Sequence, residues 1–194
     1  MDNKRLFLAL ELPAPSKQAI DQWRALHFAH LDKKPIKADN YHITLVFLGH
    51  TAPDAQQQLL NALSQQNNLS LNLSLNLPLN LPLNLPLNLQ IDTTAWWLKP
   101  KLIYLAPSSV PEALVQLQQR LNQMVAELGL ATETRPYQPH ISLYRKINTS
   151  VFEQLQIKGW PQPDLAVTIE HLALYQSVSG PDGVVYEVVE RFKI

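Results

Sequence analysis

Two short tetrapeptides place histidine and hydroxyl side chains at the same spacing. They are His42-Ile43-Thr44-Leu45 and His140-Ile141-Ser142-Leu143, about half the chain length apart. Alternate residues of a β-strand share one face, so each tetrapeptide predicts a histidine beside a hydroxyl on one face and two apolar residues in a core. Two copies in similar contexts indicate a two-fold site to which each half of the chain contributes one imidazole.

Two imidazoles facing each other across a cleft are suited to acid–base catalysis, because one can accept a proton while the other gives one. The hydroxyls of Thr44 and Ser142 could donate hydrogen bonds to an oxyanion, and phosphate offers several acceptor oxygens around one centre. Arg145 follows the second tetrapeptide closely and could supply positive charge, and Arg135 is a second candidate for that role.

Other chemistries have weaker support in the sequence. A metal site usually needs a third ligand at short spacing, and neither tetrapeptide has one adjacent. The chain has five glycines and no glycine-rich phosphate loop, which argues against ATP-dependent chemistry. The remaining histidines are expected on the surface, at helix ends or in structural positions: His27, His30, His50 and His171.

The same order of predicted elements precedes each tetrapeptide. An apolar strand at residues 6–12 and an amphipathic helix at about 16–31 come before His42. A strand at 102–105 and a helix at 110–128 come before His140, with Ser109 and Glu112 as a predicted capping box. This order indicates a duplicated strand–helix–strand unit.

The rest of the chain predicts both helices and strands. A helix is expected to begin near residues 51–54 and to run to about residue 65, and a short helix is expected at 148–156. Residues 165–175 and 184–192 are rich in β-formers and flank the turn signal Gly180-Pro181-Asp182-Gly183.

Residues 69–91 alternate Leu or Ile with Ser, Asn, Pro or Gln, and they carry no charge. Period two predicts a strand, whereas prolines at positions 78, 82 and 86 exclude a central one. The three prolines share one edge, so the other edge could still pair. One straight strand of this length would exceed the width of a compact chain. The segment is either a low-complexity insertion or a flap that could mediate self-association.

Composition sets the broad limits. The chain of 194 residues has a formal net charge of zero, so any contact with nucleic acid should be local. It has no cysteine, which excludes disulfides and thiol chemistry and is compatible with a reducing cytoplasm. The first residues make a poor signal peptide, and no stretch is long and apolar enough for a membrane span. A cytoplasmic protein without membrane partners is therefore expected.

Three segments carry a resemblance to a known family. They are residues 5–10 (RLFLAL), 39–49 (DNYHITLVFLG) and 135–145 (RPYQPHISLYR). Together they resemble the 2H phosphoesterase superfamily, named for two His-x-[Thr/Ser]-x motifs, and most closely its bacterial and archaeal RNA 2′,3′-cyclic phosphodiesterases, also called 2′-5′ RNA ligases. The resemblance covers nearly the whole chain except the Leu-Asn-Leu-Pro repeat. It suggests one domain over 1–194 with an insertion at about 69–91.

The resemblance implies an α+β fold with two lobes related by a pseudo-two-fold duplication. Each lobe would be an antiparallel sheet backed by helices, with the active-site cleft between the lobes. It also implies hydrolysis, without metal or cofactor, of RNA 2′,3′-cyclic phosphate to a 2′-phosphomonoester, with reversible 2′-5′ ligation as a related activity. A binding module for such RNA ends, without turnover, is the alternative.

The roles of individual residues follow from the same resemblance. His42 would protonate the leaving 3′ oxygen and His140 would activate water, although the sequence itself does not distinguish acid from base. Thr44, Ser142 and Arg145 would hold the phosphate. Candidates for stacking a base are Tyr41, Phe47, Trp96, Trp97 and Tyr144.

The repeat should be dispensable for chemistry, because residues 69–91 have no ionisable side chain. Deleting residues 73–86 should preserve turnover of a small cyclic nucleotide, while solubility or solution mass could change. Turnover and solution mass of the deletion and the parent would be compared. Lost turnover in a well-folded deletion would show that the repeat belongs to the site.

Overall fold

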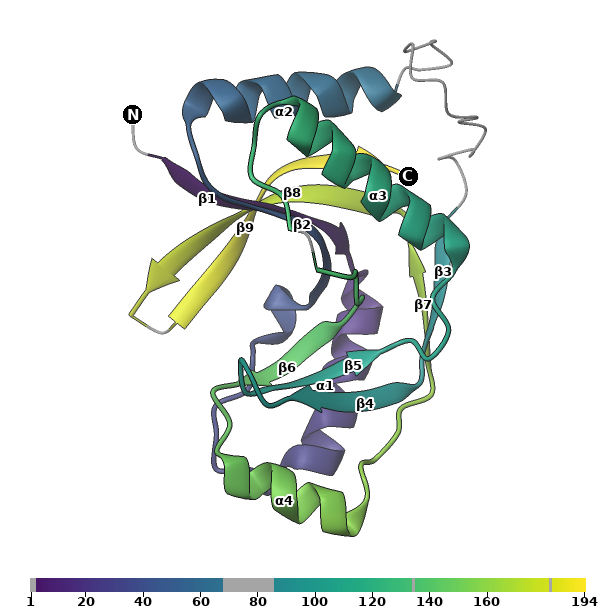
Figure 1. The fold of residues 1–194 in the computed structure, drawn as a ribbon. Helices are drawn as coiled ribbons and strands as arrows, with labels where there is room; N and C mark the ends of the chain where they lie inside the picture. The colour runs from purple at the N-terminus through teal and green to yellow at the C-terminus, as the bar shows by residue number, and fades with distance from the viewer. Residues whose placement is uncertain (1–2, 68–85, 134, 182) are drawn as a thin grey trace.

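The chain folds into two lobes around a common core (Figure 1). The computed structural model describes residues 3–67, 86–133, 135–181 and 183–194. The pairings among its described strands are antiparallel, which confirms the predicted α+β class. In chain order the elements are β1 Lys4–Glu11, α1 Ala14–Phe28, a 3-10 turn Ala38–Asn40, β2 His42–Thr51, α2 Pro53–Asn67, β3 Leu87–Ile91, β4 Thr93–Trp97, β5 Leu102–Ala106, α3 Glu112–Glu127, β6 Ile141–Arg145, α4 Thr149–Lys158, β7 Leu165–Ile169, β8 His171–Gly180 and β9 Gly183–Lys193.

Each lobe has its own sheet. The His42 lobe contains the four-stranded sheet β2-β1-β8-β9, with α2 and α3 above it in Figure 1. The His140 lobe contains the three-stranded sheet β4-β5-β6, with α1 behind it and α4 below it in the same view. Strands β3 and β7 pair with each other along one side of both lobes. The predicted arrangement of two lobes is therefore confirmed.

The two halves of the chain exchange elements between the lobes. Strand β4 from the first half pairs with β5, and β8 from the second half pairs with β1. The helices cross in the same way. Helix α1 contacts the His140 lobe, where Arg24 Nη1 donates to Tyr144 Oη over 3.2 Å. Helix α3 contacts the His42 lobe, where Gln118 Nε2 donates to the Leu45 carbonyl over 3.4 Å.

This exchange produces one continuous apolar core instead of two. Leu8 and Leu10 of β1 belong to the same buried cluster as Ile103 of β5 and Ile141 of β6. Separating the lobes would expose this cluster to water, at a cost of about 25 cal/mol for each Å² of apolar surface. The two tetrapeptides are thus held on a common rigid support.

Two sequence predictions about these elements were wrong. The capping box does not form: α3 begins at Glu112 after the extended Pro111, no side chain caps it, and Glu112 Oε1 accepts from Gln116 instead. Residues 165–175 are not one strand. The chain breaks at Glu170 because β7 pairs with β3 in one sheet while β8 pairs with β1 in another. The predicted helices near 53 and 149 and the strand after Gly183 are confirmed.

The end of the Leu-rich repeat is part of the fold. In β3, Leu89 and Ile91 are buried and Asn88 and Gln90 are exposed, as the alternation predicts. Residues 68–85 lie outside the described residues, and so do the predicted free edge and self-association of that segment. No helix in the described part of the chain is both long and apolar enough to cross a membrane.

The packing of α3 on the His42 lobe can be tested by one buried leucine. Leu121 of α3 is 4 % exposed, whereas Leu26 of α1 is 78 % exposed. Leu121→Ala should lower the free energy of unfolding by about 2–5 kcal/mol, and Leu26→Ala by about 0.5 kcal/mol or less. Urea unfolding of both variants measures the difference. Equal losses would mean that α3 does not cover this core.

Candidate active site

The two histidines occupy equivalent places at the starts of two strands. His42 is the first residue of β2, and His140 directly precedes β6. The apolar residues of each tetrapeptide are buried: Ile43, Leu45, Ile141 and Leu143. The histidines and the hydroxyl residues Thr44 and Ser142 are only half-buried. The structure therefore has the alternation expected from the two motifs.

Both imidazoles are held by the same backbone hydrogen bond. His42 Nδ1 donates to the carbonyl of Asn40 over 2.7 Å, and His140 Nδ1 donates to the carbonyl of Gln138 over 2.9 Å. A carbonyl oxygen can only accept, so Nδ1 carries the proton in both rings. In the neutral ring Nε2 is then the free base. His42 Nε2 accepts a hydrogen bond from Thr44 Oγ1 over 3.1 Å.

Asn40 positions His42, and sequence reasoning missed it. Its side-chain Nδ2 donates to the carbonyl of Val184 over 2.8 Å, and its Oδ1 accepts from the Tyr186 amide over 3.1 Å. Asn40 is almost fully buried, and both ends of its amide bond to the backbone of β9. The carbonyl that holds His42 is thereby fixed to the β8–β9 hairpin. The only signal in the sequence was an Asn two positions before the His.

Aromatic rings surround each histidine. The His42 ring lies 4.9 Å from Phe7 and 4.9 Å from Tyr186, and 5.9 Å from Tyr175, between ring centroids. The His140 ring lies 4.6 Å from Trp97 and 5.5 Å from Tyr104. The neighbours come from other strands of the same sheet, which are β1, β8 and β9 around His42 and β4 and β5 around His140. The two lobes thus build similar apolar walls.

These walls lower the pKa of both imidazoles. Burial is the main cause and takes the pKa of His42 to about 4, against the raising effect of the bond to Asn40. Burial also lowers the pKa of His140. The charge of Arg145 lowers the pKa of both, and His140 itself acts on His42. Arg145 and the two histidines therefore lie close enough to share one electrostatic environment.

A β-bulge follows the hydroxyl residue in each motif. Thr44 pairs with Ala9 but Val46 with Leu8, which leaves Leu45 as the extra residue of β2. In β6, Ser142 pairs with Tyr104 but Tyr144 with Ile103, which leaves Leu143 extra. A bulge reverses the alternation beyond it. It therefore turns Phe47 and Arg145, each five residues after its histidine, onto the face of that histidine.

The positions of their side chains exclude several of the residues that were expected to stack a base. Tyr41 and Tyr144 are each 1 % exposed and belong to the core, so neither can stack a base. Tyr41 Oη donates to Asp21 over 3.1 Å, and Tyr144 Oη donates to the Phe28 carbonyl over 3.3 Å. Trp96 stacks on Phe152 with 4.8 Å between centroids. Trp97 beside His140 and the exposed Phe47 remain candidates for stacking a base.

Arg135 does not join this group. Its guanidinium lies 2.8 Å from the carboxylate of Glu133 and is largely exposed. Arg145, unlike Arg135, lowers the pKa of His140. The candidate phosphate cation is therefore Arg145. Within the described ranges, no three His, Asp or Glu side chains cluster closely enough to hold a metal.

Comparisons with known proteins identify the family. The model of the 2′-5′ RNA ligase superfamily matches residues 12–181. The RNA 2′,3′-cyclic phosphodiesterase of Escherichia coli (strain K12) is 31% identical over 150 residues, which are 76% of this chain and 75% of that protein. The enzyme of the same name from Methanocaldococcus jannaschii is 26% identical over 203 residues, 97% of this chain and 99% of that protein. The chain belongs to the 2′-5′ RNA ligase superfamily.

Solved structures agree with this assignment. The crystal structure of E. coli LigT complexed with 3′-AMP has a TM-score of 0.78 and 26% identity, and covers 99% of this chain and 98% of that one. The crystal structure of E. coli LigT complexed with phosphate has a TM-score of 0.76 and 25% identity, and covers 100% of this chain and 99% of that one. The fold described above is thus that of the 2H phosphoesterases.

Anion binding should be linked to protonation of His42. In the free protein its pKa is about 4, so the ring is neutral at pH 7. A nearby anion stabilises the imidazolium and raises the pKa. NMR titration of the His42 ring should show a higher pKa with saturating sulfate, whose charge is constant over this range. Sulfate should therefore bind more tightly at pH 5 than at pH 7. An unchanged His42 pKa in saturated protein would contradict the site.

Proposed function

We propose that this protein hydrolyses the 2′,3′-cyclic phosphate end of RNA to a 2′-phosphomonoester. The observation that carries the proposal is the pair of imidazoles, each with Nδ1 bonded to a carbonyl and Nε2 left for chemistry. The relatives named RNA 2′,3′-cyclic phosphodiesterase support the same substrate class. The absence of a cysteine excludes thiol catalysis, and acid–base chemistry by the two histidines accounts for the reaction.

The proposed reaction is a single displacement at phosphorus. His140 Nε2 takes a proton from a water molecule as its oxygen forms a bond to phosphorus. The bond from phosphorus to the 3′ oxygen breaks, and His42 Nε2–H gives its proton to that oxygen. The products are a 3′ hydroxyl and a phosphate on the 2′ oxygen. His140 ends protonated and His42 neutral, so one proton must move between them, through solvent, before the next turnover.

The substrate itself helps to set the starting protonation state. In the free protein the pKa of each histidine is lowered, chiefly by burial. A phosphodiester anion between the rings favours one imidazolium, because it supplies the missing opposite charge. The acid is thus formed where the anion binds. The rate should then follow a bell in pH, and the two limbs belong to the coupled pair.

The hydroxyls and Arg145 hold the phosphate oxygens in this proposal. In the free protein Thr44 donates to His42 Nε2. When that nitrogen is protonated it becomes a donor, so the Thr44 hydroxyl is released to donate to a phosphate oxygen. Ser142 is its equivalent in β6, and Arg145 adds a charge that strengthens as the phosphorus centre gains negative charge. Trp97 and Phe47 provide faces for the base.

2′-5′ ligation would use the same groups in the same roles, with a 5′ hydroxyl in place of water. His140 would take the proton of the 5′ hydroxyl as its oxygen bonds to phosphorus, and the 3′ oxygen would leave with a proton from His42, which forms a 2′-5′ bond. The name of the superfamily supports this second activity. Whether hydrolysis or ligation dominates would depend on the concentration of RNA ends, because water is always in excess.

Replacing either histidine with asparagine tests the mechanism. The shorter side chain can still donate to the carbonyl that holds Nδ1, but it has no counterpart of Nε2. His42→Asn and His140→Asn should each lower turnover of adenosine 2′,3′-cyclic phosphate by about 10²–10⁴-fold. His27 lies at the end of α1, and His27→Asn is the matched control. Its turnover of the same substrate should equal that of the wild-type protein.

The assay should contain EDTA and should identify the product isomer by ³¹P NMR. Thermal unfolding of each variant would show that the fold is retained. Near-normal turnover in either site variant would eliminate the two-histidine mechanism. Tight binding of a cyclic-phosphate RNA end with no turnover in the wild-type protein would instead favour the binding module.

A further inference from the structure

The face of the β1–β2 ribbon that carries His42 continues well beyond the histidine. Directly paired residues of antiparallel strands share a face. Four pairs follow one another on this face, in the order Glu11–His42, Ala9–Thr44, Phe7–Phe47 and Arg5–His50. Residues of β1 alternate regularly between the two faces. Each bulge adds one residue to β2, so the paired residues of β2 stay on the same face as their β1 partners. A reactive histidine, a hydroxyl, an aromatic platform and a basic pair therefore form one row.

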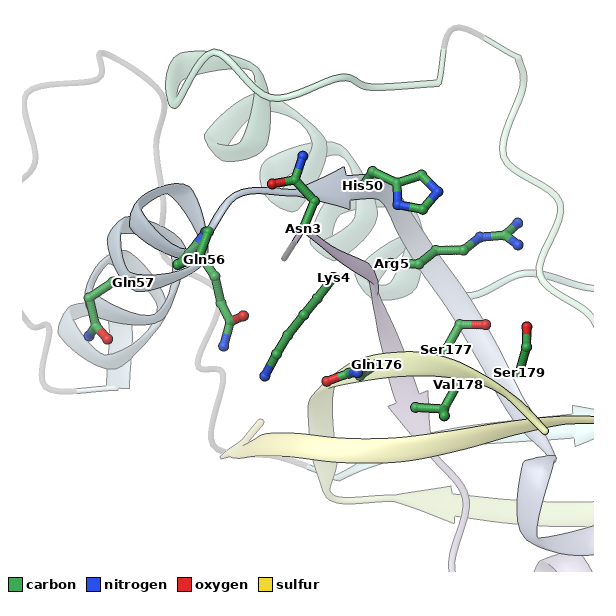
Figure 2. Close-up of a pocket in the computed structure, with 11 residues that line it drawn as sticks. Asn3, Lys4, Arg5, His50, Gln56, Gln57, Gln176, Ser177, Val178 and Ser179 are labelled. Carbon is green, nitrogen blue, oxygen red and sulfur yellow. The ribbon is translucent and has the colours of Figure 1, made fainter. Parts of the chain in front are cut away.

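Arg5 and His50 line a surface hollow. Figure 2 shows this hollow at the start of β1, where the side chains of Arg5 and His50 extend to the same side. Its volume is about 680 Å³. Ser177 and Ser179 of β8 line the hollow on the same side as Arg5. They lie on the same face of the sheet as Ala173 and Tyr175, which pack beside Phe7 of β1. Lys4 points the other way in Figure 2, toward Gln56 of α2.

Arg5 carries the positive charge on this side of the hollow. Arg5 and His50 are exposed, and no carboxylate among the described residues forms an ion pair with Arg5. The chain as a whole has no net positive charge, so a local cluster of this kind must provide any contact with RNA. Guanidinium, imidazole N–H and serine hydroxyl groups are all donors to phosphate oxygens.

Phe47 connects the hollow to the histidines. Its ring is 44 % exposed and packs on Phe7, with 6.1 Å between centroids. An exposed ring supported from below is a platform on which a base of any type can stack. A stacked base at Phe47 would place the preceding backbone phosphate nearer to Arg5 and His50, which occupy the next position in the row.

We infer that this row is a binding track for single-stranded RNA, and that Arg5, His50, Ser177 and Ser179 hold a backbone phosphate upstream of the cyclic end. The inference rests on the proposed function, and it adds a reason for the protein to prefer RNA over mononucleotides. Arg5 lies six residue steps along β1 from Glu11, the partner of His42. At about 3.3 Å per residue this is about 20 Å, beyond the reach of one nucleotide bound at His42.

The test compares Arg5→Ala with Lys4→Ala. Both variants remove one exposed cation from the same hollow, but only Arg5 lies on the face of His42. The substrates are adenosine 2′,3′-cyclic phosphate and a hexanucleotide that ends in a 2′,3′-cyclic phosphate. Arg5→Ala should raise KM for the hexanucleotide by about tenfold and leave its kcat unchanged. The KM and kcat for the mononucleotide should also be unchanged. Lys4→Ala should leave KM and kcat unchanged for both substrates.

Salt dependence gives a second readout that a structural defect would not imitate. Each phosphate contact adds about one unit to the slope of log affinity against log salt concentration. The slope for the hexanucleotide should therefore fall by about one in Arg5→Ala and stay the same in Lys4→Ala. Equal losses in the two variants, or an equal loss on the mononucleotide, would overturn the track. Lys99 lies in the β4–β5 turn of the other lobe. A lower salt slope for the hexanucleotide in Lys99→Ala but not in Arg5→Ala would place the RNA on that lobe.

A binding measurement separates this inference from the proposed function. Fluorescence anisotropy of a labelled hexanucleotide with a 2′-phosphate would be measured on His140→Asn protein with and without Arg5→Ala. Weaker binding with Arg5→Ala supports the track even where turnover is absent. Failure of the wild-type protein to hydrolyse both the mononucleotide and the hexanucleotide would refute the proposed function alone. Unchanged anisotropy would refute the track alone.

Discussion

The proposed chemistry of this site depends on one backbone hydrogen bond that each histidine makes through Nδ1. The carbonyls of Asn40 and Gln138 accept from Nδ1, so both rings have the same tautomer and the same free nitrogen. Without these bonds a neutral imidazole could place its proton on either nitrogen, and its working atom would be undefined. The Asn40 carbonyl is fixed in turn by the bonds of its side chain to Val184 and Tyr186.

The fold supplies the second requirement, which is that two equivalent strands place their histidines close enough to interact. Each half of the chain lends a helix and a strand to the other lobe, so the two histidines rest on one core. Burial lowers the pKa of both imidazoles, because it removes the water that would stabilise the charged form.

Much of this could be predicted from the sequence, and the failures have identifiable causes. The alternation of His42, Ile43 and Thr44 is local, so it gave the correct face for the histidine and the hydroxyl. The bulges at Leu45 and Leu143 depend on the pairing of neighbouring strands, so simple alternation does not give the faces of Phe47 and Arg145 beyond them. The partners of Asn40 are more than 140 residues away in the chain, so no local pattern revealed its role. The exchange of helices between lobes is likewise set by tertiary packing.

The central claim is that the two Nε2 atoms act as acid and base on one phosphate. The most direct test varies the leaving group, since a good leaving group needs no acid. Turnover of a cyclic nucleotide and of a p-nitrophenyl phosphodiester would be compared for wild type, His42→Asn and His140→Asn. The account predicts that His42→Asn loses the cyclic nucleotide but recovers most of its rate on the p-nitrophenyl ester, while His140→Asn loses both. Equal losses for both variants on both substrates would contradict the assignment of a separate acid and base.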